Sequence, residues 1–390
     1  MKIVSKRVFV TAGALLMLLF AACVPQPIDT NWAHLSVING QIAMPFHDRL
    51  ALINPVNGQP VELRDPQGQV RRDDQGNPRT WQVTNPAGSC APTGPNCFYA
   101  PPIQLSENTL LAASYNKQLF EVDVQAARID NTRGRAVDGH IVGNPITYNN
   151  TLIVPFGEQD VVALNLDTFE TIWRFDTERG VWAQPLLVEN TLYIPSMDHR
   201  LYAVNATTGE EVWRLNLDGA VASTPLFYDG SLYVGSFGGK MYQISPRGEI
   251  TAQFDGIAEW VWGTPAIADN ILYTADTGGN VYALQIGTDS FTQLWAQKVA
   301  ERAIRASPLI VGDRLVVGSR DSNLYWINRS DGTEVYERPL GGEMLADLLL
   351  LEPSETVNID EPLIIVSTMA RNRAVIAYTL ENVERWAFAF

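Results

Sequence analysis

The sequence predicts an all-β protein, namely an eight-bladed β-propeller whose blades are four-stranded antiparallel sheets. The first observation is a 40-residue spacing of prolines, at Pro145, Pro185, Pro225 and Pro265. Each of these prolines is followed seven residues later by a leucine, at Leu152, Leu192, Leu232 and Leu272. The second observation is that each unit contains several short apolar segments. A fixed period of this length, with four strands per unit, is typical of a propeller blade.

The four strands of a unit are clearest between residues 185 and 214. Apolar residues fill 185–188, 192–195 and 201–204, and the fourth strand, 211–214, is Glu-Val-Trp-Arg. The segments between them are short and contain turn residues such as Asn190 and Gly209. Each strand is therefore expected to pair with the next one along the chain.

Copies of the third strand recur eight times, at 50–53, 119–122, 161–164, 201–204, 241–244, 281–284, 324–327 and 375–378. An aromatic residue marks the fourth strand of seven units, at Trp81, Trp173, Trp213, Phe254, Trp295, Tyr336 and Trp386, and Ile129 replaces it in the second unit. We expect these large side chains to fill the wedge between neighbouring blades. Seven blades with an irregular extension is the alternative, because the eighth copy aligns only when an insertion is left out.

Two polar insertions interrupt the period, at about 64–97 and 352–361. Long polar loops of this kind lie outside a core. The expected organisation is a lipoprotein signal peptide over 1–22, a short tether over 23–31 and the propeller over 32–390.

The N-terminus has the pattern of a bacterial lipoprotein. Lys2, Lys6 and Arg7 precede an apolar run over 8–22, which is too short for a membrane span, and Cys23 follows two alanines. Phe20 stands where such signals usually carry leucine, so a plain signal peptide cut nearby is the alternative. Diacylglycerol on Cys23 and an acyl chain on its amine would anchor the protein stably to a bacterial membrane, at its periplasmic face or at the cell surface.

Charge and cysteine content agree with an exported protein. Loss of the three basic leader residues would lower the formal net charge from −15 to −18, which disfavours nucleic-acid binding. The other two cysteines, Cys90 and Cys97, lie in a Gly- and Pro-rich loop, and we expect them to form a disulfide. The four histidines show no metal-ligand spacing, so no metal site is expected.

The segment Ala203-Val204-Asn205-Ala206-Thr207-Thr208-Gly209-Glu210-Glu211-Val212-Trp213 resembles the tryptophan-docking repeat of the pyrroloquinoline-quinone-like propellers. Residues 307–310, 315–319 and 324–328 are similar to a blade of the BamB-type lipoproteins within that group. The resemblance covers about 32–390. It implies a non-catalytic, monomeric scaffold without a cofactor, which holds a protein partner of the cell envelope through loops at one end.

Two other functions remain possible. One is an extracytoplasmic propeller that binds a carbohydrate or another small ligand. The second is a quinoprotein dehydrogenase, which would hold pyrroloquinoline quinone over calcium. That class is usually much longer and often has adjacent cysteines, whereas Cys90 and Cys97 are not adjacent, and no calcium-loop spacing is present.

Candidate partner-binding residues come from the loops that enter each first strand. Three residues before the repeat's proline lie Trp32, Tyr99, Val142, Trp182, Ala222, Trp262, Arg305 and Met344. Aromatic residues with one arginine are typical of a contact surface, although packing between blades would also explain them. Trp260 is expected on the same side as Trp262, because alternate residues of an extended strand share a face. His199, Phe237 and Arg320, from the turns between second and third strands, are expected at the same end.

Overall fold

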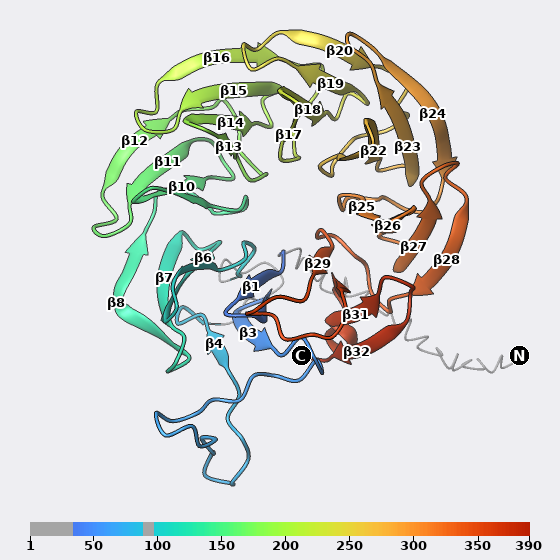
Figure 1. Ribbon diagram of the computed structural model, residues 1–390. Helices are drawn as coiled ribbons and strands as arrows, with labels where there is room; N and C mark the ends of the chain where they lie inside the picture. The colour runs from blue at the N-terminus through green and yellow to red at the C-terminus, as the bar shows by residue number, and fades with distance from the viewer. Residues whose placement is uncertain (1–33, 89–96) are drawn as a thin grey trace, which may run out of the picture.

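The computed structural model describes residues 34–88 and 97–390, in which 32 strands form eight four-stranded sheets around an axis (Figure 1). All strand pairs within the sheets are antiparallel, as in β13–β14, β14–β15 and β15–β16. The structure therefore confirms the eight-bladed propeller, and the seven-bladed alternative is wrong.

The strands of the first four blades have the following bounds. Blade one is β1 (Ser36–Ile38), β2 (Gln41–Phe46), β3 (Arg49–Ile53) and β4 (Gln82–Thr84). Blade two is β5 (Ile103–Ser106), β6 (Thr109–Ser114), β7 (Gln118–Asp123) and β8 (Arg128–Ala136). Blade three is β9 (Ile146–Tyr148), β10 (Thr151–Pro155), β11 (Val161–Asn165) and β12 (Thr171–Phe175). Blade four is β13 (Leu186–Val188), β14 (Thr191–Pro195), β15 (Arg200–Asn205) and β16 (Glu211–Asn216).

The other four blades repeat this plan. Blade five is β17 (Leu226–Tyr228), β18 (Ser231–Gly235), β19 (Met241–Ile244) and β20 (Ile250–Phe254). Blade six is β21 (Ala266–Ala268), β22 (Ile271–Ala275), β23 (Asn280–Ile286) and β24 (Phe291–Lys298). Blade seven is β25 (Leu309–Val311), β26 (Arg314–Gly318), β27 (Asn323–Asn328) and β28 (Glu334–Pro339). Blade eight is β29 (Leu349–Leu351), β30 (Leu363–Ser367), β31 (Val375–Thr379) and β32 (Glu384–Phe388), with a 3₁₀ turn, η1 (Arg371–Arg373), before β31.

The second and third strands of each blade are buried on both faces. Along β10, Leu152 and Val154 pack toward blade two, whereas Ile153 packs toward blade four. The side chains of a strand alternate between its two faces, so one apolar run serves two blade junctions. Burial on both faces explains why these strands are continuously apolar in the sequence instead of alternating.

The core is divided among the junctions between blades. Within the described residues, the buried apolar side chains form eight clusters, one at each junction of neighbouring blades. No blade has an apolar core of its own. Each blade is therefore stabilised by its two neighbours, as in other repeat architectures.

Tryptophans of the outermost strands join one blade to the next. The Trp173 Nε1 donates a hydrogen bond of 3.1 Å to the Ala206 carbonyl oxygen of blade four. Gly209 has a φ of +75° and lies against the Trp173 ring, where a Cβ atom would stand 2.8 Å from it. Only glycine fits this position without strain. The same arrangement recurs for Trp213 on Gly248 and Trp295 on Gly332.

The fifth blade departs from the predicted pattern. Ala203 of β15 faces Trp213, and the corresponding Gln243 of β19 faces Ala252. Phe254 lies two residues further along β20, so it is not the equivalent of the docking tryptophans. The register between the third and fourth strands shifts at a bulge in every blade except the first, which the spacing in the sequence does not reveal.

The ring closes without exchange of a strand, because each blade consists of four consecutive strands. The Trp386 Nε1 donates to the Pro55 carbonyl oxygen at 2.9 Å, and the Trp386 ring covers Gly58 of blade one. The Phe390 ring stacks on Phe46 at a centroid distance of 4.8 Å. Side-chain packing therefore carries the closure, and Figure 1 shows the first and last blades side by side.

The connection between β3 and β4 projects away from the ring (Figure 1). It contains two similar turns, in which the Asp65 and Asp73 Oδ1 atoms each accept two backbone N–H bonds of 2.8–3.0 Å. Cys23, Trp32 and Cys90 lie outside the described residues, so the lipid anchor and the disulfide stay predictions. No helix in the described part of the chain is long and apolar enough to cross a membrane.

Replacing Trp386 with alanine should destabilise the whole ring. Its side chain is only 9% exposed and joins blades eight and one, which no shared strand connects. We expect the free energy of unfolding to fall by about 3–5 kcal/mol, measured by urea denaturation. Tyr336→Ala is the matched control, because Tyr336 occupies the same register in blade seven but is 37% exposed, and its loss should cost about 1 kcal/mol. Equal losses in the two variants would show that closure does not depend on Trp386.

Candidate functional site

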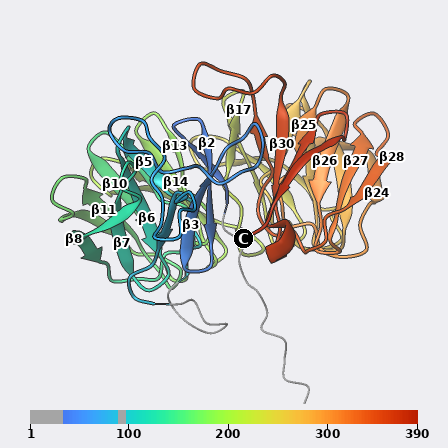
Figure 2. The ribbon, with the colours of Figure 1, turned by 90° about the horizontal axis from the view of Figure 1, so that it is seen from below.

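Two sets of loops meet at one end of the propeller, here called the loop face. They are the loops that enter each first strand and the turns between second and third strands. The Val181 N–H donates to the Phe156 carbonyl oxygen at 2.9 Å, and the Met197 N–H donates to the Gly180 oxygen at 3.0 Å. Equivalent bonds continue from blade to blade, and Figure 2 shows the blades from the side. The backbone of the loop face is therefore fixed.

A cavity of about 680 Å³ opens on the axis at this face. The predicted column contributes five of its lining residues, at Val142, Trp182, Ala222, Trp262 and Arg305, and in blade eight Leu345 lines the cavity. A volume of this size is typical of small-ligand sites.

The local backbone explains why Trp182 and Trp262 reach the cavity. Each follows a fully buried valine, Val181 or Val261, whose N–H is bonded to the preceding blade. In extended backbone the next side chain points the other way, toward the axis. Ala222 occupies the intervening column position, and its small side chain leaves room for the two indoles to approach to 6.4 Å between ring centroids.

Four aromatic rings form a contiguous aromatic arc, which consists of Trp182, Trp262, Phe237 and Trp260. Phe237 stacks on Trp260 at 4.8 Å with an interplanar angle of 7°, and it lies 5.1 Å from the Trp262 ring. Trp260 is 50% exposed and Trp182 is 42% exposed. The arc therefore presents large apolar faces to solvent at the mouth of the cavity.

Arg305 lies over one end of the arc. Its guanidinium carbon is 4.2 Å from the centre of the Trp262 ring, which is a cation–π contact. Burial and the nearby charge of Arg320 lower the pKa of Arg305, while Glu343 acts in the opposite direction. The Nε atom is buried and has no hydrogen-bond partner in the described part of the chain.

Polar residues form a second layer around the axis, below the column. The Thr264 N–H donates to the Ser307 Oγ at 3.0 Å, and the Ser307 N–H donates to an Asp347 oxygen at 2.6 Å. The Asp347 N–H in turn donates to the His34 Nδ1 at 3.4 Å. These residues precede the first strands of four neighbouring blades, so the bonds tie the blades together at the axis.

The other three candidate residues lie outside the arc. Arg320 is paired with Glu343 at 2.8 Å, close to Arg305. Tyr99 packs edge-on against Tyr115 at 5.3 Å, in a separate group of rings. His199 is exposed and takes a φ of +70°.

His199 lies in the predicted turn between β14 and β15, and one column residue differs from the prediction. Gly239 and Gly279 occupy the turn position of His199 in the next two blades, which could have identified it as a left-handed turn residue. In blade eight, Leu345 lines the cavity, whereas Met344 is fully buried against Gly318. Blade eight lacks the repeat's proline, so the sequence did not show that its column position is one residue later than predicted. The polar layer was not predicted, although each member stands just before a first strand.

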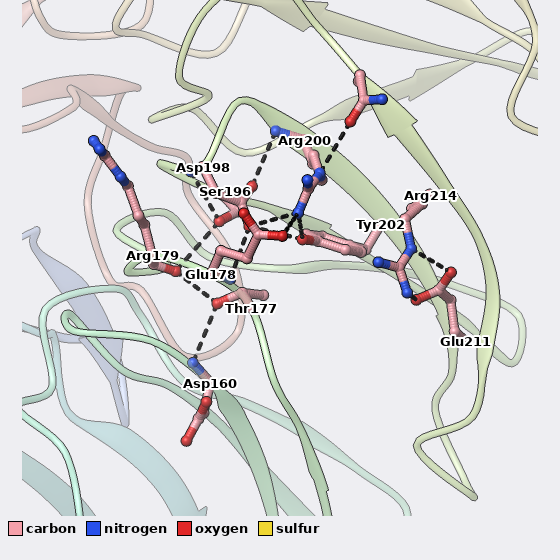
Figure 3. Close-up of polar contacts among 11 residues, drawn as sticks. Asp160, Thr177, Glu178, Arg179, Ser196, Asp198, Arg200, Tyr202, Glu211 and Arg214 are labelled. Atoms are coloured by element: carbon pink, nitrogen blue, oxygen red, sulfur yellow. Dashed lines mark hydrogen bonds and ion pairs between the residues drawn. The ribbon is translucent and has the colours of Figure 1, made fainter.

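A polar network at the side of the loop face closes a turn (Figure 3). The Tyr202 hydroxyl donates to the Asp198 carboxylate at 2.7 Å, and Arg200 pairs with Glu178. Burial raises the pKa of Tyr202 to about 12, so its hydroxyl stays protonated and donates to Asp198 at neutral pH. Tyr282 binds Asp276 and Tyr325 binds Asp321 in the same way. These contacts hold the turns between β14 and β15, β22 and β23, and β26 and β27 at the loop face.

Calcium over a quinone requires several oxygen ligands, usually including carboxylates. Of the cavity-lining residues that the structure describes, Asp347 alone carries a carboxylate, and it is already bonded to Ser307. No group of three or more His, Cys, Asp or Glu side chains able to hold a metal ion occurs in residues 34–88 and 97–390. The residues present therefore do not fit a calcium-bound quinone.

Solved propellers with low sequence identity share the architecture. BamB from Moraxella catarrhalis matches with a TM-score of 0.62 and 16% identity, over 88% of this chain and 92% of that chain. Sqt1 of Saccharomyces cerevisiae matches with a TM-score of 0.63 and 14% identity, over 86% and 92%. The computationally designed Ika8 protein matches with a TM-score of 0.61 and 13% identity, over 92% and 96%. Likeness at these identities shows the fold alone.

Sequence comparison adds the family. No curated protein matches the chain in sequence. The family profile described as "Outer membrane protein assembly factor BamB" matches residues 157–290 and 242–376, which together exceed half of the chain. The protein therefore belongs to the family of the outer membrane protein assembly factor BamB.

Proposed function

We propose that this protein is a lipid-anchored, non-catalytic scaffold that binds a protein partner of the cell envelope through its loop face. The observation that carries the proposal is the exposed aromatic arc with Arg305 at one end of a rigid propeller. Aromatic residues and arginine dominate the energetics of protein interfaces. Family membership supports the same function, since its printed description is that of an assembly factor.

The tether supports an orientation of the loop face toward the membrane. His34 precedes the first strand and lines the axial cavity, so the chain enters the propeller at the loop face. The eleven Cα–Cα steps from Cys23 to His34 span at most about 40 Å when fully extended. A lipid on Cys23 would therefore hold the loop face near the membrane, where a membrane-embedded partner is within reach.

A small-ligand function is the second candidate, because the axial cavity has the volume and the mixed apolar and polar lining of ligand sites. The two functions differ in which residues matter. A protein partner depends on the exposed part of the arc, whereas a small ligand depends on the cavity-lining residues.

Replacing Cys23 with serine tests the anchor. A serine oxygen cannot replace the cysteine sulfur as the acceptor of the diacylglycerol, so the variant should move from the membrane to the soluble fraction on cell fractionation. Identical fractionation of the wild type and Cys23→Ser would show that the protein is not held by a lipid at this residue.

Replacing Trp260 with alanine tests the partner surface, because Trp260 is exposed and does not line the cavity. Crosslinking and pull-down from detergent-solubilised membranes should show at least tenfold weaker capture of a defined envelope partner, the loss typical of an interface hot spot. The melting temperature should stay nearly unchanged. Leu294→Ala is the matched control, since Leu294 is 49% exposed on the outermost strand of blade six. Equal capture by Trp260→Ala and wild type would remove the arc from the interface.

Pyrroloquinoline quinone with calcium tests the redox alternative. Since the cavity offers a single carboxylate, which is already bonded, equilibrium dialysis should detect no stoichiometric binding of the quinone. Dye-linked oxidation of alcohols or sugars should also stay at background. Stoichiometric binding with calcium-dependent activity would make the protein a quinoprotein.

A further inference from the structure

Arg305 differs from the other arginines that lie over aromatic rings. The described residues contain four such pairs, in which Arg214, Arg305, Arg314 and Arg329 contact a ring. Three of the four have a carboxylate partner: Arg214 binds Glu211, Arg314 binds Asp313 and Arg329 binds Asp269. Arg305 forms no ion pair with any carboxylate of the described chain, and its buried Nε has no hydrogen-bond partner. A partly buried cation without a counter-ion is costly, so a site of this kind favours an anion.

The neighbouring charges leave Arg305 unneutralised. Glu343 is the carboxylate whose charge raises the pKa of Arg305, but Glu343 is bound by both Arg302 and Arg320. Burial alone would raise the pKa of Glu343, but the hydrogen bonds from the two arginines outweigh burial and lower it. Two arginines thus bind this carboxylate and Arg305 has none of its own, on a protein whose overall charge is strongly negative.

A second polar group in the cavity also lacks a partner. Ser223 lines the cavity and is only 3% exposed, and its Oγ has no hydrogen-bond partner in the part of the chain that the structure describes. Buried hydroxyls are normally hydrogen-bonded, so an unpaired one facing a cavity indicates a ligand atom. The corresponding residues of the adjacent blades, Ala183 and Gly263, have no polar side chain.

We propose that the axial cavity binds a carboxylate-bearing ligand, whose carboxylate pairs with the Arg305 guanidinium while its apolar part lies against the Trp182 and Trp262 rings. The Ser223 hydroxyl supplies a further hydrogen bond to the ligand. This site lies at the face to which the proposed function assigns the partner, but it uses cavity-lining residues that the partner test leaves unchanged.

The chemistry favours a carboxylate over a phosphate dianion. A guanidinium matches the planar carboxylate with two parallel hydrogen bonds. The cavity offers one unpaired positive charge, and Asp347 on its wall would repel a second negative charge on the ligand. The two indole rings, 6.4 Å apart, provide apolar faces for the adjoining part of the ligand.

Two sources can supply this chemistry, and a pair of probes represents each. A free small molecule is represented by 4-phenylbutyrate, with the neutral 4-phenylbutyramide as its isostere. An acidic side chain of a partner is represented by acetyl-Gly-Glu-Leu-Gly-amide, with glutamine in place of glutamate in its isostere. Titration calorimetry on the full mature chain should give a dissociation constant of about 1 mM or tighter for one or both acids and weaker binding of the amides.

Three variants test the assigned groups. Arg305→Gln should weaken binding of the acid at least about tenfold and leave binding of the amide unchanged. Ser223→Ala should weaken it about three- to tenfold, since a neutral hydrogen bond is lost. Arg214→Gln is the matched control, because it removes the same charge from an arginine over a ring that already has its own carboxylate.

Folding and binding can be separated, because Arg305→Gln removes an unpaired charge and should not lower the melting temperature. If 4-phenylbutyrate binds more tightly than its amide, the ligand is a free small molecule. If only the glutamate peptide binds more tightly than its glutamine isostere, the ligand is a side chain of a partner. The proposal is overturned if neither acid binds, if acid and amide bind equally, or if Arg305→Gln binds the acid as the wild type does. A loss of partner capture in Trp260→Ala with unchanged acid binding would separate the two proposals.

Discussion

Apolar packing between neighbouring blades is the interaction on which the whole structure depends. The second and third strands are buried on both faces, and the eight core clusters lie at the eight junctions. An isolated four-stranded blade would leave both apolar faces in water. Stability is therefore a property of the closed ring. The junction between blades one and eight differs from the others because the chain does not lead directly from one of these blades to the other, and side chains such as Trp386 and Phe390 hold it closed.

Because packing between blades supplies the stability, the side chains of the loop face can vary in chemistry. Backbone hydrogen bonds between consecutive loops fix the path of the chain, and a buried aliphatic residue such as Val181 or Val261 fills the junction beneath. The next side chain reaches the axis whatever its type. The column can thus hold tryptophan, alanine or arginine with the same backbone, and the choice of small Ala222 between Trp182 and Trp262 brings the two indoles together.

The fold could be predicted from the sequence because the repeat appears in many copies. The spacing of prolines and the eight third-strand segments determine blade number and strand order. Local register was less accessible: Gln243 of β19 pairs with Ala252, so Ala252, and not Phe254, stands at the docking position. Where blade eight lacks the proline, Leu345 and not Met344 lines the cavity.

The aromatic arc was predicted only as a column of residue types. Its contacts depend on Phe237, which comes from a turn in a different part of the unit and stacks on Trp260. The unpaired state of Arg305 could not be read from the sequence at all. Arg305 lacks a counter-ion because Glu343 pairs with Arg302 and Arg320, and both of these arginines are distant from Glu343 in the sequence. Pairing between side chains requires distances that a repeat pattern does not contain.

Trp262 connects the two parts of the loop face, because it contacts Phe237 in the exposed arc and Arg305 in the cavity. A ligand that neutralises Arg305 changes the electrostatic environment of the Trp262 ring, and a partner that covers the arc restricts the same ring. Two sites that share a side chain in this way are coupled by a free energy, and the coupling is reciprocal. The unpaired charge of Arg305 lowers the stability of the fold. Natural proteins retain destabilising groups of this kind where binding requires them. On the two proposals, the occupancy of the axis and the affinity for a partner would be linked through Trp262.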